Sequence, residues 1–315
     1  MSSSNKVITS LHRHFNSVLV RDIYTSPVVT VDENDLFSVV EDKFRKHRIK
    51  HLPIVSKAKK LKGLMTMSDL HRIIPPKRNF KTQEFYYVQK ELNQIDLQKK
   101  MTPNPNSLKE LNTLMEVLEH MVGGGYGCIP VVDDQEKVLG IVTQTDVIVL
   151  LNQAVQSLKS DDHEGGKSYA EMLDDIKLKV MMSYPPIVLS EEEELSVVEK
   201  TLRESRIKHL PIVNASNELS GIVTISDLYQ INAPRVENAD GTVTYKQEML
   251  DKYILKHWMT KNPTTLTPDN SLLNAMERMV AGKYGCIIIT DNVKHIKGII
   301  TQTDVIKAIL KITMM

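Results

Sequence analysis

Residues 63–69 read GLMTMSD, and the same phrase returns as GIVTQTD at 140–146, GIVTISD at 221–227 and GIITQTD at 298–304. Its consensus is Gly-apolar-apolar-Thr-x-(Ser/Thr)-Asp. The closing Asp stands at positions 69, 146, 227 and 304, so successive copies are 77, 81 and 77 residues apart. Near-even spacing of one phrase indicates a tandem array of a single structural unit. The phrase therefore bears on both the architecture and the class of ligand.

The array has a second level of repetition, at an offset of 158 residues. KHRIKHLPIV at 46–55 matches ESRIKHLPIV at 204–213, and MVGGGYGCIPVV at 121–132 matches MVAGKYGCIIIT at 279–290. Copies one and three therefore resemble each other, as do copies two and four. A unit of about 50–60 residues buries little apolar surface alone. We therefore expect copy one to associate with copy two, and copy three with copy four.

Each copy is predicted to contain a strand, a helix, two strands and a second helix. A Pro-containing opening phrase suits a short edge strand; the four versions are IYTSPVVTV, KMTPNPNSL, MMSYPPIVL and WMTKNPTTL. An amphipathic helix follows, with apolar residues three and four positions apart, such as Leu36, Val39, Val40 and Phe44. An apolar run such as HLPIV, a polar turn, the GLMT or GIVT run and a final helix complete the copy. This order predicts an α/β (α+β) fold.

The predicted boundaries place the four copies at 16–75, 96–157, 171–233 and 252–315, after a polar N-terminal tail at 1–15. The Ser-, Asp- and Gly-rich stretch 158–170 is predicted to be a linker between the two halves. Longer polar inserts follow copies one and three, IIPPKRNFKTQEFYY and INAPRVENADGTVTY. We expect each insert to be a flexible connection.

Composition argues against several classes of protein. Lys plus Arg number 40 and Asp plus Glu number 39, so a net charge of +1 gives no electrostatic footprint for nucleic acid or an anionic membrane. No apolar run reaches the roughly 18 residues of a membrane span, and the N-terminus lacks the apolar middle of a secretion signal. We therefore expect a cytoplasmic protein. Cys128 and Cys286 occupy the same repeat position, which favours small buried side chains over a disulfide or a metal pair.

The repeated Thr and Asp fit two roles. A carboxylate accepts two hydrogen bonds and so can hold both hydroxyls of a ribose diol. A Thr hydroxyl at the end of a strand lies beside a helix N-terminus, where backbone N–H groups and the helix dipole favour a phosphate. The same two residue types also suit a helix N-terminus for capping alone. The sequence leaves both interpretations open.

The copies differ just before the apolar run. Copies one and three carry Arg48, Lys50 and His51, and Arg206, Lys208 and His209; copies two and four carry Gly127-Cys128 and Gly285-Cys286. A lysine and a titratable imidazole suit a phosphate-bearing ligand better than an uncharged one, and a solvated basic strand end is the alternative. We predict that phosphates are held mainly by copies one and three. Tyr126 and Tyr284 are candidates either to stack on adenine or to pack at the helix-to-strand corner.

The opening M-T-x-x-P phrase, the LPIV strand and the G-h-h-T-x-(S/T)-D phrase together resemble cystathionine β-synthase (CBS) domains, two of which make a Bateman module. Four copies are similar to the γ subunit of AMP-activated protein kinase and to stand-alone prokaryotic four-CBS proteins. The resemblance implies two Bateman modules, two clefts in each, and a disc formed within one chain. It implies ribose binding by Asp69, Asp146, Asp227 and Asp304, and phosphate binding by Thr66, Thr143, Thr224, Thr301, Lys50, His51, Lys208 and His209.

The repeats occupy nearly the whole chain, which has no P-loop, dinucleotide-binding glycine fingerprint or Cys/His metal spacing. We therefore expect no enzymatic activity, no catalytic residue, no metal site and no required cofactor. The expected function is regulatory: binding AMP, ADP or ATP and relaying the ligand state, by module rearrangement, to an effector protein or another copy of the chain. The alternatives are an interaction scaffold without ligand and a sensor of another adenosyl ligand such as S-adenosylmethionine. Neither nucleic acid nor a membrane is an expected partner.

Overall fold

The structure is a computed structural model that describes residues 11–73, 77–78, 85–87, 92–158, 168–230, 235–237, 243–245 and 255–314. The chain divides into two compact units. Unit 1 comprises residues 1–28, 106–186 and 264–315, and unit 2 comprises residues 29–105 and 187–263. Unit 1 therefore holds the bodies of copies two and four, and unit 2 holds the bodies of copies one and three.

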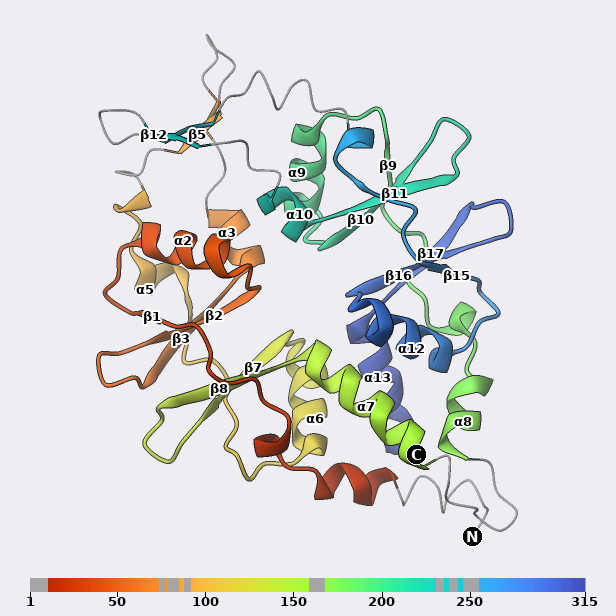
Figure 1. The fold of residues 1–315 in the computed structure, drawn as a ribbon, viewed down its shortest axis with the longest axis horizontal. Helices are drawn as coiled ribbons and strands as arrows, with labels where there is room; N and C mark the ends of the chain where they lie inside the picture. Colours follow the sequence, from red (N-terminus) through yellow and green to blue (C-terminus); the bar gives the residue numbers. More distant parts are fainter. Residues whose placement is uncertain are drawn as a thin grey trace. The chain divides into compact units, whose positions relative to one another are not determined.

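The bodies in unit 2 have the predicted order of elements (Figure 1). Copy one contains β1 (Val31–Asp32), α2 (Phe37–His47), β2 (His51–Val55), β3 (Leu61–Thr66) and α3 (Met67–Ile73). Copy three contains β9 (Leu189–Ser190), α9 (Leu195–Glu204), β10 (His209–Val213), β11 (Leu219–Thr224) and α10 (Ile225–Gln230). In both copies the HLPIV strand has four buried residues, so it forms the centre of its sheet.

The bodies in unit 1 repeat this order. Copy two contains a single bridge at Leu108, α6 (Leu114–Gly124), β7 (Cys128–Val132), β8 (Val138–Thr143) and α7 (Gln144–Leu158). Copy four contains β15 (Thr265–Leu266), α12 (Leu272–Gly282), β16 (Cys286–Thr290), β17 (Ile296–Thr301) and α13 (Gln302–Thr313). Capping boxes begin α6 at Thr113 and α12 at Ser271. The predicted mixed α and β architecture with four repeats is therefore confirmed.

Each opening phrase belongs to two copies at once. Its end pairs in parallel with the central strand of its own copy, as β1 does with β2. Its beginning pairs antiparallel with the other copy of the module: Thr25 with Ile141, β6 (Thr102–Pro103) with β3, Ser183 with Ile299, and β14 (Thr260–Lys261) with β11. Short helices precede these exchanged segments, η1 (Val20–Asp22), α5 (Leu97–Lys100), η2 (Leu178–Val180) and η3 (Leu255–His257). Exchange thus joins copy one to two and three to four, as predicted.

The glycine of the repeated phrase lies under the exchanged segment. A Cβ at Gly140 would stand 2.5 Å from the carbonyl oxygen of Thr25, and one at Gly298 would stand 3.0 Å from that of Ser183. At Gly63 a Cβ would collide with the side chain of Met101. Only a residue without a side chain allows the two backbones to approach so closely. The glycine is therefore explained by the strand exchange.

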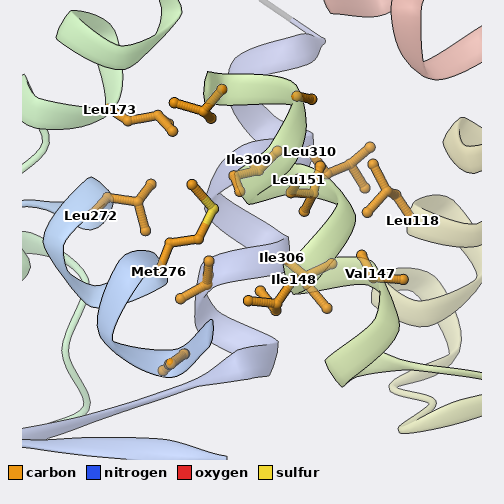
Figure 2. Packing of buried hydrophobic residues seen from close by; sticks show 14 of the residues in the cluster. Leu118, Val147, Ile148, Leu151, Leu173, Leu272, Met276, Ile306, Ile309 and Leu310 are labelled. Atoms are coloured by element: carbon orange, nitrogen blue, oxygen red, sulfur yellow. The ribbon is translucent and has the colours of Figure 1, made fainter. Parts of the chain in front are cut away.

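Hydrophobic packing joins a different pair of copies in each unit. In unit 1, α7 packs against α12 and α13, and Figure 2 shows Val147 and Leu151 of α7 in the same cluster as Ile306 and Leu310 of α13. In unit 2, one cluster combines side chains of copies one and three, including Phe44 and Leu202. The helices that pack together in this second association could not be identified from the sequence, because an apolar helix stripe does not identify the helix that covers it.

A helix precedes the first copy where the sequence predicted a polar tail. Residues 11–17 are helical, and Leu11 and Phe15 are fully buried in the cluster of unit 1. The equivalent helix before copy three is α8 (Tyr169–Asp175), which begins with a capping box at Ser168. The predicted tail is therefore wrong for residues 11–15, because side chains four positions apart form one apolar face. Residues 1–10, and residues 159–167 of the predicted linker, lie outside the described part of the chain.

The inserts after copies one and three contribute strands. These are β4 (Lys77–Arg78), β5 (Phe85–Tyr87), β12 (Arg235–Glu237) and β13 (Val243–Tyr245). They form one antiparallel sheet in the order β12-β13-β5-β4 (Figure 1). The prediction of purely flexible connections is wrong for these segments, and the rest of both inserts lies outside the described residues. No helix in the described ranges is long and apolar enough to cross a membrane.

Candidate functional site

The Thr and Asp of each repeated phrase form one hydrogen-bonded pair where the last strand meets the final helix. In copy one, the Thr66 backbone N–H and hydroxyl donate to Asp69 Oδ2 at 2.9 and 2.7 Å, and the Asp69 N–H donates to Thr66 Oγ1 at 3.2 Å. The hydroxyl-to-Oδ2 distance is also 2.7 Å in the other three pairs, Thr143–Asp146, Thr224–Asp227 and Thr301–Asp304. The capping role is therefore present in every copy.

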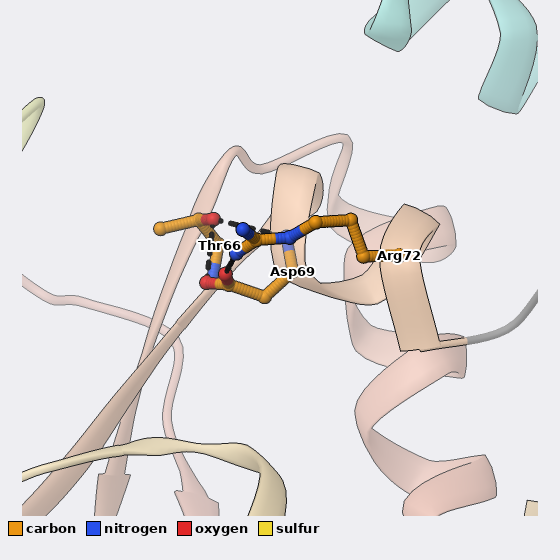
Figure 3. A network of polar contacts seen from close by, with 3 residues as sticks. All are labelled: Thr66, Asp69 and Arg72. Atoms are coloured by element: carbon orange, nitrogen blue, oxygen red, sulfur yellow. Dashed lines mark hydrogen bonds and ion pairs between the residues drawn. The ribbon is translucent and has the colours of Figure 1, made fainter. Parts of the chain in front are cut away.

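Capping occupies only one oxygen of each carboxylate. Among the described residues, no group donates to Oδ1 of Asp146, Asp227 or Asp304. Asp69 differs because the Arg72 guanidinium donates to its Oδ1 in an ion pair (Figure 3). A carboxylate oxygen without a donor is able to accept a ligand hydroxyl. Three of the four copies therefore retain an acceptor, and sequence reasoning missed Arg72, whose three-residue separation from Asp69 was the available signal.

Each Thr lies directly across a strand pair from the residue that distinguishes the copies. The register places His51 opposite Thr66 and His209 opposite Thr224 in unit 2. In unit 1 it places Cys128 opposite Thr143 and Cys286 opposite Thr301. Opposed residues on one face have Cβ atoms about 4.5–5.5 Å apart. The strand register therefore brings the predicted phosphate-binding Thr and His together in copies one and three.

Unit 2 gathers the four predicted basic residues of copies one and three. The pKa of His51 is lowered to about 4, chiefly by burial and then by repulsion from Lys208 and Lys50, while Asp69 acts in the opposite direction. The pKa of His209 is also lowered to about 4, by burial and then by Lys50 and Lys208. Each imidazole thus experiences the lysine of the other copy. We call Lys50, His51, Lys208 and His209 the basic cluster.

The basic cluster has no internal counter-ion for its lysines. Both lysine side chains are exposed, and within the described ranges no carboxylate forms an ion pair with either. Asp69, beside His51, is already paired with Arg72. An anion bound between the lysines would relieve their repulsion and favour the protonated imidazoles. The arrangement therefore suits a ligand with a phosphate near its sugar.

Unit 1 has a neutral arrangement at the corresponding positions. The Gln144 amide donates to the Thr303 hydroxyl at 2.9 Å, and the Gln302 amide donates to the Thr145 hydroxyl at 3.2 Å. These bonds connect the first residues of α7 and α13. Unit 2 has buried Met67 and Ile225 in place of the two glutamines. Sequence reasoning missed this contrast, which is visible as TQTD against TMSD and TISD.

The remaining predicted residues of unit 1 make packing contacts, while Tyr126 and Tyr284 stay 36% and 39% exposed. The rings of Tyr126 and Tyr284 cover Gly124 and Gly282, where an added Cβ would collide with them. The Asn106 amide also donates to the Tyr126 hydroxyl at 2.9 Å. Cys128 and Cys286 are buried thiols, not a disulfide. In the part of the chain that the structure describes, no group of three His, Cys, Asp or Glu side chains is placed to hold a metal ion.

Comparison with known proteins places this geometry in a family. The CBS domain model matches residues 20–76, 94–152, 174–232 and 255–311. An uncharacterized 33.4 kDa protein in the ribosomal RNA operon of Thermofilum pendens is 26% identical over 270 residues, which is 83% of this chain and 81% of that protein. The γ subunit of 5′-AMP-activated protein kinase from Kluyveromyces lactis is 23% identical over 157 residues, 46% of this chain and 41% of that subunit.

A solved structure shows the same fold over almost the whole chain. Protein MJ1225 of Methanocaldococcus jannaschii is 24% identical over 306 residues, 91% of this chain and 95% of that protein. Its crystal structure superimposes with a TM-score of 0.71 at 20% identity, covering 93% of this chain and 100% of that one. Four consecutive family matches account for more than half of the residues. The protein therefore belongs to the CBS domain family.

Proposed function

We propose that this protein is a regulatory sensor of the adenine nucleotides AMP, ADP or ATP. CBS domain proteins generally serve as regulatory sensors of adenosyl ligands. The observation that carries the proposal for this chain is the basic cluster of unit 2, in which two lysines and two imidazoles from copies one and three come together, and no carboxylate of the described residues forms an ion pair with either lysine. A nucleotide phosphate supplies the missing negative charge.

The ribose is assigned to the repeated aspartates. Oδ1 of Asp146, Asp227 and Asp304 accepts the ribose hydroxyls while Oδ2 keeps its cap to the Thr. The Thr hydroxyls and the first N–H groups of the final helices lie next to the sugar and assist with phosphate. Asp69 contributes only after it exchanges Arg72 for the ligand, so copy one binds more weakly than copy three.

The relatives support a regulatory function in which a separate effector protein responds to the ligand. The Kluyveromyces lactis relative is the γ subunit of 5′-AMP-activated protein kinase, and the Methanocaldococcus jannaschii protein of known structure has been called a "putative archaeal homolog" of such a γ subunit. We propose that nucleotide binding changes the arrangement of the modules and that another protein reads the change. A ligand shifts such an equilibrium by its difference in affinity for the two states.

Thermal unfolding with added nucleotide tests the proposal. AMP, ADP or ATP should raise the melting temperature, because a ligand that binds only the folded state stabilises it by mass action. Lys50→Ala combined with Lys208→Ala should remove most of the shift. Lys294→Ala in the β16–β17 turn is the matched control and should retain it. An equal shift in wild type and the double variant would refute the phosphate assignment.

A ligand-free interaction scaffold is the second candidate, favoured by the complete Thr-Asp capping in all four copies. No thermal shift with any purine nucleotide is the result expected of a scaffold. S-adenosylmethionine provides the third arm of the experiment. If S-adenosylmethionine stabilises the protein at a lower concentration than AMP, ADP or ATP does, the ligand is another adenosyl compound and not an adenine nucleotide.

A further inference from the structure

The turn between β2 and β3 concentrates positive charge in one place. Lys57, Lys59, Lys60 and Lys62 fall within six residues of each other, and we call residues 56–62 the lysine hairpin. Lys57 and Lys59 are exposed, and Lys60 and Lys62 are half-buried. The lysine hairpin connects one end of the strand pair, and His51 and Thr66 stand at the other end.

The fold does not require these lysines, as the three other copies show. Copy three has the same turn with Ala215, Asn217, Glu218 and Ser220 at the four lysine positions. The backbone is the same in all four turns, since φ is 63° at Lys59, 64° at Glu136, 61° at Asn217 and 62° at Lys294. The N–H of the same residue closes each turn, at 2.8 Å in copy one and 3.0 Å in copy three. The lysines of copy one are therefore dispensable for the turn itself.

In the part of the chain that the structure describes, no ion pair neutralises the charge of the lysine hairpin. In copy four, Lys297 forms an ion pair with Asp291 at 2.9 Å, but the equivalents in copy one are Lys62 and Ser56. Across the described residues, no carboxylate forms an ion pair with any lysine of the hairpin. Lys57 and Lys59 lower the pKa of Asp32, after the larger effect of its hydrogen bonds from Asn34, so they act on it only at longer range. Four repelling charges remain.

We propose that the lysine hairpin is a docking surface for an acidic segment of a separate protein. Lysines are flexible point charges that pair readily with Asp and Glu side chains. The hairpin contains neither Arg nor an aromatic residue that would read or stack on bases. Its apolar members are only Ala58 and the half-buried Leu61, too little to insert into a membrane.

A second copy of this chain is a poorer source of the acidic segment. Two acidic side chains in its turns already form ion pairs with lysines of their own chain: Asp134 with Lys109 at 2.6 Å, and Glu192 with Lys256 at 2.9 Å. Binding of these turns to the lysine hairpin would have to break those pairs. An unpaired acidic segment of another protein faces no such competition, so charge complementarity favours it.

The position of the lysine hairpin connects docking to ligand. β2 has five residues, which span about 13–17 Å, and it runs from His51 at the proposed nucleotide site to the hairpin. The paired strands β2 and β3, whose register shifts between Ile54 and Val55, therefore connect the two places directly. Docking itself does not depend on the proposed nucleotide site, so it is measured on the ligand-free protein.

The test uses the same pair of substitutions in two turns. Lys59→Asn with Lys62→Ser introduces the residues of copy three into copy one, and Lys294→Asn with Lys297→Ser makes the identical change in copy four. A labelled oligoglutamate peptide is the probe, with binding followed by fluorescence anisotropy at low and physiological salt. The copy-one variant should bind about tenfold more weakly. The copy-four variant should bind within about twofold of wild type, because Lys297 is already paired.

Four results would overturn the proposal. These are no binding by wild type, equal losses in the two variants, tighter binding to phosphatidylserine vesicles or duplex DNA through the same lysines, and salt-sensitive self-association that only the copy-one variant loses in sedimentation. Circular dichroism checks that both variants fold, which we expect because copy three already folds with the introduced residues. If the wild-type protein binds the peptide but no nucleotide, the result contradicts the proposed nucleotide-sensing function and leaves the docking proposal standing.

Discussion

Arg72 sets the first copy apart from the other three at the scale of a single side chain. Its guanidinium takes the Asp69 oxygen that the other copies leave without a described donor. The corresponding residue of copy three is Gln230, and that of copy four is Lys307, which forms no ion pair with Asp304 among the described residues. One residue in the first turns of the final helix therefore decides how many aspartates are ready to bind a ribose.

Replacing Arg72 with the glutamine of copy three should strengthen nucleotide binding at the first copy. Arg72→Gln replaces the competing guanidinium with an uncharged amide and so breaks the ion pair to Asp69, and a hydrogen bond to a charged group contributes about 1.5–3 kcal/mol. We expect affinity for AMP at that copy to rise about tenfold or more in isothermal titration calorimetry. Lys307→Gln is the matched control, because it changes the same position without freeing a carboxylate. Unchanged or weaker binding in Arg72→Gln would contradict the assignment.

The two half-buried imidazoles of the basic cluster, His51 and His209, predict a pH dependence of stability. The pKa of His51 and that of His209 are lowered to about 4 in the folded protein, against about 6.5 in an unfolded chain. The unfolded state therefore binds more protons between these values, and stability falls as the pH drops from about 6.5 to about 4. Each histidine contributes about 1–3 kcal/mol to this loss.

Chemical denaturation at several pH values measures that effect. His51→Gln with His209→Gln should flatten the decline below pH 6.5, since glutamine does not titrate. His47→Gln replaces an exposed histidine at the end of α2 and should leave the decline unchanged. A decline of equal steepness in wild type and the double variant would contradict the lowered pKa values of these two imidazoles.

At the scale of the helices and strands, the exchange of the opening phrases determines which strands pair with each other. Each opening phrase leaves the sheet of its own copy and covers the glycine of the neighbouring copy. The repeated glycine was recognisable from the sequence, but its reason was not, because the segment above it lies about 40 residues away in the chain in copies one and three and about 115 residues away in copies two and four. Gly140 shows the tightest approach, with a backbone oxygen and the ring of Tyr24 both in the space that a Cβ would occupy.

Adding a methyl group at Gly140 should therefore weaken the fold. Gly140→Ala forces the Thr25 segment away from β8, and overpacking of this kind costs about 1–3 kcal/mol. Gly123→Ala is the control, because a Cβ there meets no atom within 4 Å and alanine favours a helix by roughly 0.5–1 kcal/mol. Urea denaturation compares the two. Equal stabilities of Gly140→Ala and wild type would contradict this prediction, because they would show that the exchanged segment moves away from β8 without a loss of stability.

Element order, the four repeats and the Thr-Asp pairs could be predicted from the sequence because each depends on local pattern. The helical residues 11–17 were missed because Leu11 and Phe15 stand alone among polar neighbours, so the apolar signal is short. Arg72 and the contacts of Gln144 depend on side-chain geometry that residue spacing does not determine. The partner of each helix face, such as Leu151 against α13, is a tertiary choice among several equally apolar stripes.

At the scale of the whole molecule, the two hydrophobic clusters each combine side chains from both halves of the chain. Residues 168–315 contain only copies three and four, so this half provides only one side of each cluster. We expect the isolated half to form a dimer, in which a second copy covers the faces that copies one and two normally cover. Light scattering after size-exclusion chromatography measures the mass. A stable, folded monomer of residues 168–315 would contradict this prediction.

Borrowed edge strands also limit how such a protein can grow or shrink in evolution. A single copy would have an incomplete sheet, and its opening phrase would have no neighbouring strand to pair with, so we expect it not to fold stably alone. Gains and losses of repeats should accordingly come in twos, and the 158-residue period of this chain is the trace of one such doubling.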